Sequence, residues 1–305
     1  MVNASSCSPS SIRGGRPVDR PDRTLISLLS CSKWLPESLR PVVCPGPDSG
    51  FRRLRVGGPG PNQPVMQPGL TLTVTRDPDA IREARRLRHA VFVEELGAVP
   101  TAGGPVAGGL MGEGLEGDDF DADCDHVILR DPADPAAGVV ATLRVGMGTA
   151  YTEQEFDLSA LKSAGRPLAE AGRACLHPAY RNGMAGFILF KGLLNVLHSH
   201  DIAFAVGTAS FPGADLTRHL PGLRRLRHAA LAPESLRPVA HGDGAVVIEG
   251  EAPRSAMAGV PALIKTYLRA GAQVGDGAYI DRAFNTVDVC MVLDLSRVAL
   301  PGLPR

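Results

Sequence analysis

Apolar and polar positions follow strand-like and helix-like periods from residue 66 onward. Residues 66–75 alternate between the two classes, as in a strand with one buried face. The next segment repeats apolar residues every three to four positions. We therefore predict a helix from Ala80 to about Leu96, which Gly97 ends.

Strand and helix signals continue to alternate along the rest of the chain. Further strands are predicted over 126–130, 139–145, 202–211, 246–248, 278–281 and 288–293, and another begins at Leu168. Helical signals cover 151–161, 187–198, 216–238 and 260–270, and Thr152 and Glu155 resemble a capping box at the start of the first of these. No G-x-G-x-x-G motif is present, so we predict an α/β fold with a mixed central sheet flanked by helices.

The first 65 residues differ from the remainder in composition. They hold 10 of the 26 prolines, and their nine Lys/Arg against four Asp/Glu give a formal charge of +5. We predict that residues 1–65 are disordered and that residues 66–305 form one folded domain. One hypothesis is that translation starts at Met66, and the alternative is a basic arm that contacts the cytoplasmic membrane.

Composition narrows the functional classes. Thirty-two basic and 32 acidic residues balance, so the charge gives no reason to expect a nucleic-acid partner. Six cysteines occur without a C-x-x-C pair or metal-ligand spacing, which favours a reducing cytoplasm and argues against a structural metal. No apolar run reaches the roughly 18 residues of a membrane span. We expect neither a metal nor a tightly bound cofactor.

The stretch from Leu168 to Phe187 combines charge with a turn typical of phosphate sites. Its strand carries Glu170 and Arg173, and a Pro- and Gly-rich turn then opens into a helix whose N-terminus favours an anion. Residues three apart on a regular strand point to opposite faces. A bulge or splayed ladder at Gly172 would bring both charges to one face, and the alternative is an ordinary ion pair between them.

This stretch resembles the acyl-CoA-binding segment of the GNAT N-acyltransferases. The layout of Leu176-His-Pro178 and of Tyr180-Arg-Asn-Gly-Met-Ala185 is similar to the strand and phosphate loop of that superfamily. The family usually has Gln or Arg where this chain has Tyr180. The resemblance therefore implies a phosphopantetheine arm, delivered by acyl carrier protein and not by CoA. The residues that we expect to contact it are Tyr180, Arg181, Gly183, Ala185 and Gly186.

A second set of charged residues is similar, in order and spacing, to the core of acyl-homoserine-lactone synthases. Those enzymes are GNAT-like and take acyl groups from acyl carrier protein. The resemblance implies that this set faces the substrates, and the alternative for its acidic run is a solvated loop. The matching residues are Arg88, Phe92, Glu116, Asp118, Asp121, Arg144, Glu170 and Arg173.

From about Thr71 to Val298 the chain resembles the ornithine-lipid N-acyltransferases more closely. The similarity includes 88–94, 120–126, 170–175 and 209–211, and it is most distinctive in 261–271 and 284–288. This family implies transfer of a 3-hydroxyacyl chain from acyl carrier protein to the α-amine of L-ornithine, which gives lyso-ornithine lipid. Glutamine and glycine acylation, lactone synthesis, and an acyl-binding protein without activity are the alternatives.

Aminolysis of a thioester needs a base and an oxyanion site. We predict Glu170 as the base, and backbone N–H groups freed near Gly172 as oxyanion donors. Arg144 and Arg173 match an α-carboxylate, and Asp118 or Asp121 would face the ammonium of ornithine. The alternative for these charged residues is a buried network that stabilises the core. We interpret Cys175 as a small buried residue and not as an acyl nucleophile.

Overall fold

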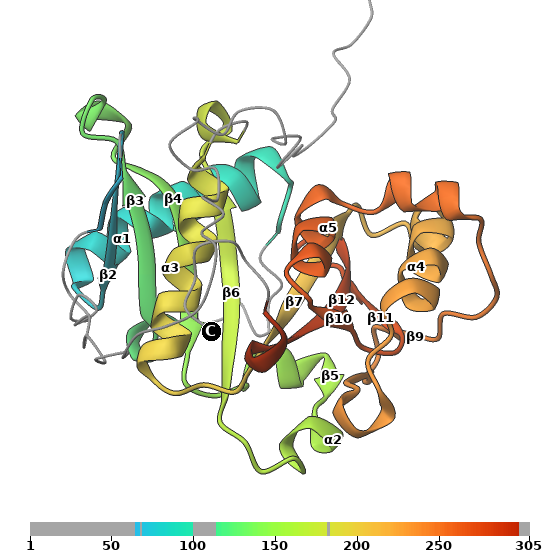
Figure 1. Ribbon diagram of the computed structural model, residues 1–305. Coiled ribbons are helices and arrows are strands. Elements are labelled where there is room, and N and C mark those ends of the chain that lie inside the picture. Colours follow the sequence, from blue (N-terminus) through green and yellow to red (C-terminus); the bar gives the residue numbers. More distant parts are fainter. Residues whose placement is uncertain (1–64, 68, 100–113, 182–183, 299–305) are drawn as a thin grey trace, which may run out of the picture.

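The computed structural model describes residues 65–67, 69–99, 114–181 and 184–298 (Figure 1). Within these residues, ten strands form one sheet in the order β1-β2-β3-β4-β6-β7-β12-β11-β9, with β10 paired to β12, and β5 and β8 form a small second sheet. The strands are β1 (Val65–Gln67), β2 (Leu70–Thr75), β3 (Asp125–Arg130), β4 (Val139–Gly146), β5 (Phe156–Asp157), β6 (Leu168–Leu176), β7 (Phe204–Pro212), β8 (Val239–Ala240), β9 (Ala245–Val246), β10 (Gln273–Val274), β11 (Ala278–Asp281) and β12 (Thr286–Asp294).

Helices cover both faces of this sheet, which confirms the predicted α/β class. In Figure 1, α3 crosses one face of β3 and β4 and α1 lies on the other. The α-helices are α1 (Pro78–Arg88), α2 (Ser159–Lys162), α3 (Ala185–Ser199), α4 (Leu216–Ala230) and α5 (Ala262–Arg269). Short 3-10 turns connect several elements, and a π-helical segment, η2 (His89–Glu95), continues α1.

The first helix begins and ends where the sequence indicates. The Asp77 side chain accepts a hydrogen bond from the N–H of Ala80 at 3.0 Å, and Pro78 occupies the first turn. Gly97 lies just beyond the helix with φ of +77°, a conformation that favours glycine. The π-helical turn was not predicted, because such turns are rare and have no sequence signal comparable to that of an α-helix.

The junction between β6 and β7 is the one parallel pair of the main sheet in the described residues. Pairing covers only Leu168 with Phe204, Ala169 with Ala205, and Glu170 with Val206. Beyond Glu170 the two strands diverge, as Figure 1 shows. Gly207 allows a close approach at this point, because a Cβ there would lie 2.1 Å from the carbonyl oxygen of Ala171. The predicted splay is confirmed.

The predicted bulge is also confirmed, one residue further along the strand. Thr142 pairs with Cys175 and Arg144 with Gly172, so two residues of β6 lie opposite the single Leu143 of β4. Arg173 takes a positive φ of 52° in this bulge. The alternative, an ordinary ion pair between Glu170 and Arg173, is wrong, because Arg173 pairs with Glu116 and Asp118 instead.

Three local predictions need correction. The strand predicted over 66–75 is a hairpin of β1 and β2, which Gly69 permits with φ of +98°. The strand predicted over 246–248 is the shorter β9. The helical insertion over 151–161 is a 3-10 turn, a short strand and α2, and its capping box is absent because Tyr151 is the N-cap and makes no side-chain bond.

Some expectations fall outside the described residues or remain predictions. Gly183 and nearly all of the segment 1–65 lie outside the described part. Residues 66–67 and 70–75 belong to the sheet, but the domain boundary and the start at Met66 stay predictions. None of the helices in the described part of the chain has the length and apolar character needed to cross a membrane.

The tight contact at the splay leads to a first prediction. Gly207→Ala would place a methyl group against the Ala171 carbonyl, so we expect it to lower the free energy of unfolding by about 3 kcal/mol. Gly172→Ala is the matched control on the neighbouring strand, because no atom lies within 4 Å of a Cβ at that position. Urea unfolding of both variants measures the difference, and equal stabilities would contradict the close approach.

Candidate active site

Three buried arginines and three buried carboxylates meet beside the bulge. Arg88 donates to Glu116, and also to Asp121 Oδ1 at 2.7 Å. Arg144 donates to Asp118, and to Asp121 Oδ1 at 2.9 Å. Arg173 donates from Nε to Glu116 at 3.1 Å and from Nη2 to Asp118 at 2.8 Å. Each arginine therefore joins two carboxylates into a closed network.

Four separate elements supply this network, and each presents its side chain for a local reason. Arg88 ends α1, and Arg144 lies on β4 where Gly172 is its partner. The acidic residues precede or open a 3-10 turn, η3 (Asp119–Asp123), which a capping box between Asp118 and Asp121 fixes. Arg173 reaches the same face through the positive φ of the bulge.

Burial makes the network a structural unit. Glu116 is 0% exposed, Asp118 6% and Asp121 3%, so the solvated-loop alternative is wrong for these residues. Burial alone would raise the pKa of Glu116, but the charges of Arg173 and Arg88 hold this pKa below its usual range. The pKa of Asp121 is likewise lowered, because Arg88 and Arg144 outweigh its burial. Glu116 and Asp121 are thus held in their charged form by the arginines beside them.

Glu170 lies beside the network without joining it. Its Oε2 accepts hydrogen bonds from the backbone N–H groups of Tyr151 at 3.1 Å and of Thr152 at 3.2 Å. Burial raises the pKa of Glu170, and those two hydrogen bonds and the charge of Arg144 only partly oppose it. A carboxylate with a raised pKa is suited to accept a proton.

A cavity whose mostly apolar wall includes charged side chains opens directly onto this carboxylate, and we call it the polar cavity. The cavity has a volume of about 180 Å³, and Arg144, Tyr151, Glu170 and Gly172 contribute to its wall. The Arg144 guanidinium lies over the rings of Phe120 and Tyr151, at 5.8 and 5.9 Å from their centroids. An amino acid bound here would have a guanidinium and a carboxylate within reach of its two ionised groups.

A second, apolar cavity lies on the opposite face of the sheet. It has a volume of about 50 Å³ and is lined by Ala171 and Gly207 at the splay, by Phe190 of α3 and by Tyr267 of α5. Side chains of adjacent strand residues alternate between faces, so Ala171 and Glu170 point to opposite sides. The splay between β6 and β7 therefore separates an apolar cavity from a polar one.

Two residues predicted to bind the phosphate, Tyr180 and Arg181, form hydrogen bonds with acidic side chains of the protein. Arg181 forms two hydrogen bonds with Glu95, at 2.6 and 2.5 Å, and the Tyr180 hydroxyl donates to Asp131 at 3.0 Å. Ala185 and Gly186 open α3, whose N-cap, Met184, makes no side-chain capping bond. A helix N-terminus favours an anion, and the role of this segment in binding the phosphate stays a prediction.

Cys175, His126 and Phe92 lie in packed surroundings near the network. Burial raises the pKa of the Cys175 thiol to about 12, so this side chain is a poor nucleophile, as predicted. His126 is 1% exposed, and its Nε2 lies 3.0 Å from the carbonyl oxygen of Asp121. Phe92 packs edge-on against Phe284 with ring centroids 6.0 Å apart, which joins η2 to the turn after β11.

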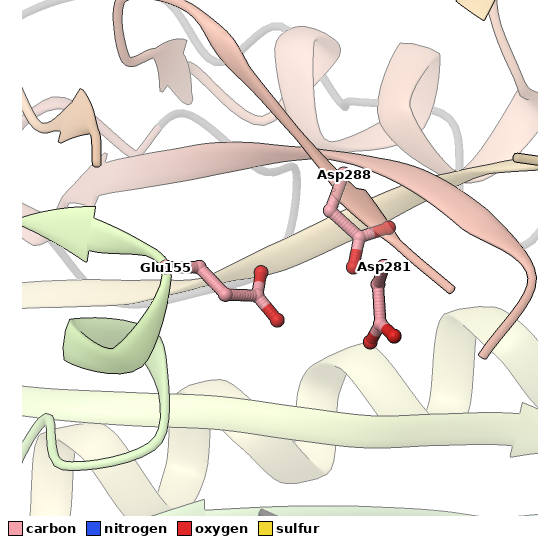
Figure 2. A group of neighbouring side chains, drawn as sticks. All are labelled: Glu155, Asp281 and Asp288. Carbon is pink, nitrogen blue, oxygen red and sulfur yellow. The ribbon is translucent and has the colours of Figure 1, made fainter. Parts of the chain in front are cut away.

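Sequence reasoning missed a second acidic group, formed by Glu155, Asp281 and Asp288. Figure 2 shows their carboxyl groups turned toward one another, and one oxygen of each lies within 4.8 Å of the others. Burial, and then the charges of Asp288 and Asp281, raise the pKa of Glu155. Glu155 had been interpreted as half of a capping box, and the aspartates are more than 120 residues away, so no local pattern indicated the group.

The charge network yields the second prediction. Arg88→Met would leave Glu116 and Asp121 buried beside fewer positive charges, so we expect the free energy of unfolding to fall by about 3–5 kcal/mol. Arg76→Met is the control, because Arg76 is 52% exposed in its ion pair with Asp125 and should lose less than about 1 kcal/mol. Denaturant unfolding distinguishes them, and a small loss for both would mean that the network is not structural.

Comparison with known proteins gives the family. Residues 87–191 match the family model described as Acetyltransferase (GNAT) domain, in agreement with the predicted fold. The chain is 40% identical over 236 residues to the L-ornithine N(alpha)-acyltransferase of Rhodobacter capsulatus, which covers 73% of this chain and 89% of that protein. It is 33% identical over 250 residues to the protein of the same name from Agrobacterium fabrum, covering 75% and 82%.

Solved structures give weaker matches. FeeM, an N-acyl amino acid synthase from uncultured soil microbes, superposes with a TM-score of 0.40 and 12% identity, covering 74% of this chain and 92% of that one. The two sequence relatives, in contrast, exceed 30% identity over most of both chains. On that basis this chain belongs to the family of L-ornithine N(alpha)-acyltransferases.

Proposed function

We propose that this protein transfers a 3-hydroxyacyl chain from acyl carrier protein to the α-amine of L-ornithine and so makes lyso-ornithine lipid. The observation that carries the proposal is the position of Glu170, a buried carboxylate at the splay that faces a polar cavity. An apolar cavity lies on the opposite face of the sheet at the same point. Family membership supplies the amino acid and the reaction class.

The acceptor amine would enter from the polar face. The α-carboxylate would meet Arg144, whose guanidinium forms part of the wall of the polar cavity. The α-ammonium would then lie near Glu170, which removes a proton either directly or through water so that the neutral amine attacks the thioester carbon. The raised pKa of Glu170 makes its carboxylate a stronger base than an exposed glutamate.

The acyl donor would occupy the splay from the apolar face. Beyond Glu170, β6 has no β7 partner among the described residues, so backbone N–H groups near Gly172 are placed to stabilise the oxyanion of the tetrahedral intermediate. Collapse of that intermediate forms the amide and releases the thiolate of the phosphopantetheine arm. The first turn of α3, together with Tyr180 and Arg181, would hold the phosphate of that arm.

The product assay uses purified full-length protein, 3-hydroxyacyl carrier protein and a panel of amino acids, followed by mass spectrometry. We expect an N-(3-hydroxyacyl)-ornithine product. An acylated glutamine or glycine would keep the reaction and change the acceptor, and a lactone formed with S-adenosylmethionine would favour the lactone-synthase alternative. Absence of every acylated product, from carrier protein and CoA donors alike, would overturn the proposal.

Glu170→Gln tests the base. The amide oxygen can still accept the two backbone hydrogen bonds, so the fold should persist while kcat falls by about 100-fold or more. In the native enzyme, activity should be lost as the pH falls through the raised pKa of Glu170, above the ordinary glutamate value of about 4.3. That acid limb should disappear in the variant.

The exposed Glu251 provides the control for this experiment. Glu251→Gln should keep both the native rate and the acid limb. A Glu170→Gln enzyme with native kcat and an unchanged pH profile would exclude Glu170 as the base and leave it a role in holding residues 151–152.

A further inference from the structure

The carboxylates of the charge network leave little capacity for a substrate cation. Asp118 accepts from Arg144 and from the N–H of Phe120 on one oxygen, and from Arg173 on the other. Asp121 accepts from Arg88 and Arg144 on Oδ1, and from the N–H of Asp118 on Oδ2. A side-chain ammonium would therefore compete with arginines at either residue.

The second acidic group is uncompensated by comparison. Glu155 is 5% exposed, Asp288 4% and Asp281 9%. Among the described residues, Glu155 Oε2 and Asp288 Oδ1 are buried without a hydrogen-bond partner. The side chains of Ser210 and Thr286 lie beside Asp288 and lower its pKa, but burial and the charge of Asp281 outweigh them. Unpaired buried carboxylate oxygens are costly, and they point to a ligand that donates hydrogen bonds and carries positive charge.

The strand register places this group on the same face as Glu170. Glu170 pairs with Val206, and Ser210, four residues further along β7, pairs with Asp288 of β12. Asp288 in turn pairs with Tyr279 of β11, two residues before Asp281. Residues that pair across two strands share a face, and so do alternate residues along one strand. Glu170, Asp288 and Asp281 therefore point to one side of the sheet. Glu155 approaches from the segment that covers this side (Figure 2).

The acidic group also interacts electrostatically with Glu170 and Arg173. The charges of Glu170 and Arg173 both act on the pKa of Glu155, and Arg173 also acts on that of Asp288. The ring of Tyr151 lies 4.5 Å from the Arg173 guanidinium. Burial raises the pKa of the Tyr151 hydroxyl, and the charges of Glu155 and Asp281 add to this rise. The acidic group therefore lies next to the proposed acceptor site and not elsewhere in the sheet.

We propose that Glu155, Asp281 and Asp288 bind the side-chain ammonium of the acceptor amino acid and so select a diamino acid. An ammonium has three N–H donors, one for each carboxylate. Acceptors at about 2.9 Å in a tetrahedral arrangement lie about 4.7 Å apart, which fits the observed limit of 4.8 Å. Asp281 already accepts the N–H groups of Ala283 and Phe284 on Oδ1, which orients its other oxygen.

This inference rests on the proposed function, and the experiment separates the two. L-Norvaline has the carbon skeleton of ornithine without the δ-amine. With full-length native enzyme and a 3-hydroxyacyl carrier protein donor, we expect kcat/KM for ornithine to exceed that for norvaline by at least about 100-fold. Asp288→Asn should lower this preference below about 10-fold while the norvaline value stays within about 3-fold of native.

The control is Asp276→Asn, which breaks the ion pair with Arg227 outside the acidic group. It should keep the native preference even if it lowers stability. A native enzyme that accepts both amino acids equally, or an Asp288→Asn variant that loses both activities in parallel, would overturn the inference without affecting the proposed acyl transfer. Failure of native enzyme on every amino acid would instead reject the proposed function.

A divalent cation is the competing occupant, and calorimetry tests it independently of activity. Ornithine should bind to native protein in the presence of EDTA and bind at least about 10-fold more weakly to Asp288→Asn. Binding of Mg²⁺ or Ca²⁺ to native protein that Asp288→Asn abolishes, together with ornithine binding that the variant retains, would assign the carboxylates to a metal and overturn the proposal.

Discussion

The divergence of β6 from β7 is the constraint on which the rest of this structure depends. Three parallel pairs hold the strands together, and the close contact of Gly207 with the Ala171 carbonyl marks the place where they separate. Cavities then open on both faces of the sheet at one point, apolar toward α3 and polar toward Glu170. Under the proposed function, the two substrates would meet at this point from opposite faces of the sheet.

The buried charge network is best understood as what holds that geometry. Arg173 has a backbone conformation that costs a non-glycine residue on the order of 1 kcal/mol or more. Its guanidinium is fixed by Glu116 and Asp118 and lies between the rings of Tyr151 and Phe284, at 4.5 and 4.7 Å from their centroids. Buried ion pairs gain little net stability, but they strongly penalise a misplaced partner. The network therefore fixes the bulge more than it stabilises the fold.

The sequence was informative where a local rule restricted the backbone. Glu170 and Arg173 are three residues apart, so a regular strand would place them on opposite faces, and the predicted bulge is present. The turns at 131–135 and 283–286 likewise located the strands that flank them, β3, β4, β11 and β12. Long-range convergence was harder to predict, because Glu155 had a sufficient local explanation as a cap while its partners lie on β11 and β12. The pairing of Arg181 with Glu95 was missed for the same reason.

Charge compensation distinguishes the two acidic groups of this protein. Glu116, Asp118 and Asp121 are paired with arginines, and the pKa values of Glu116 and Asp121 are lowered, as expected for carboxylates whose partners are already present. Burial and mutual repulsion instead raise the pKa values of Glu155 and Asp288, which have oxygens without hydrogen-bond partners. Folding alone gains nothing from such a group, because burying uncompensated carboxylates is unfavourable at neutral pH. A bound cation would remove that cost, so the difference in compensation separates carboxylates that organise the core from carboxylates that await a ligand.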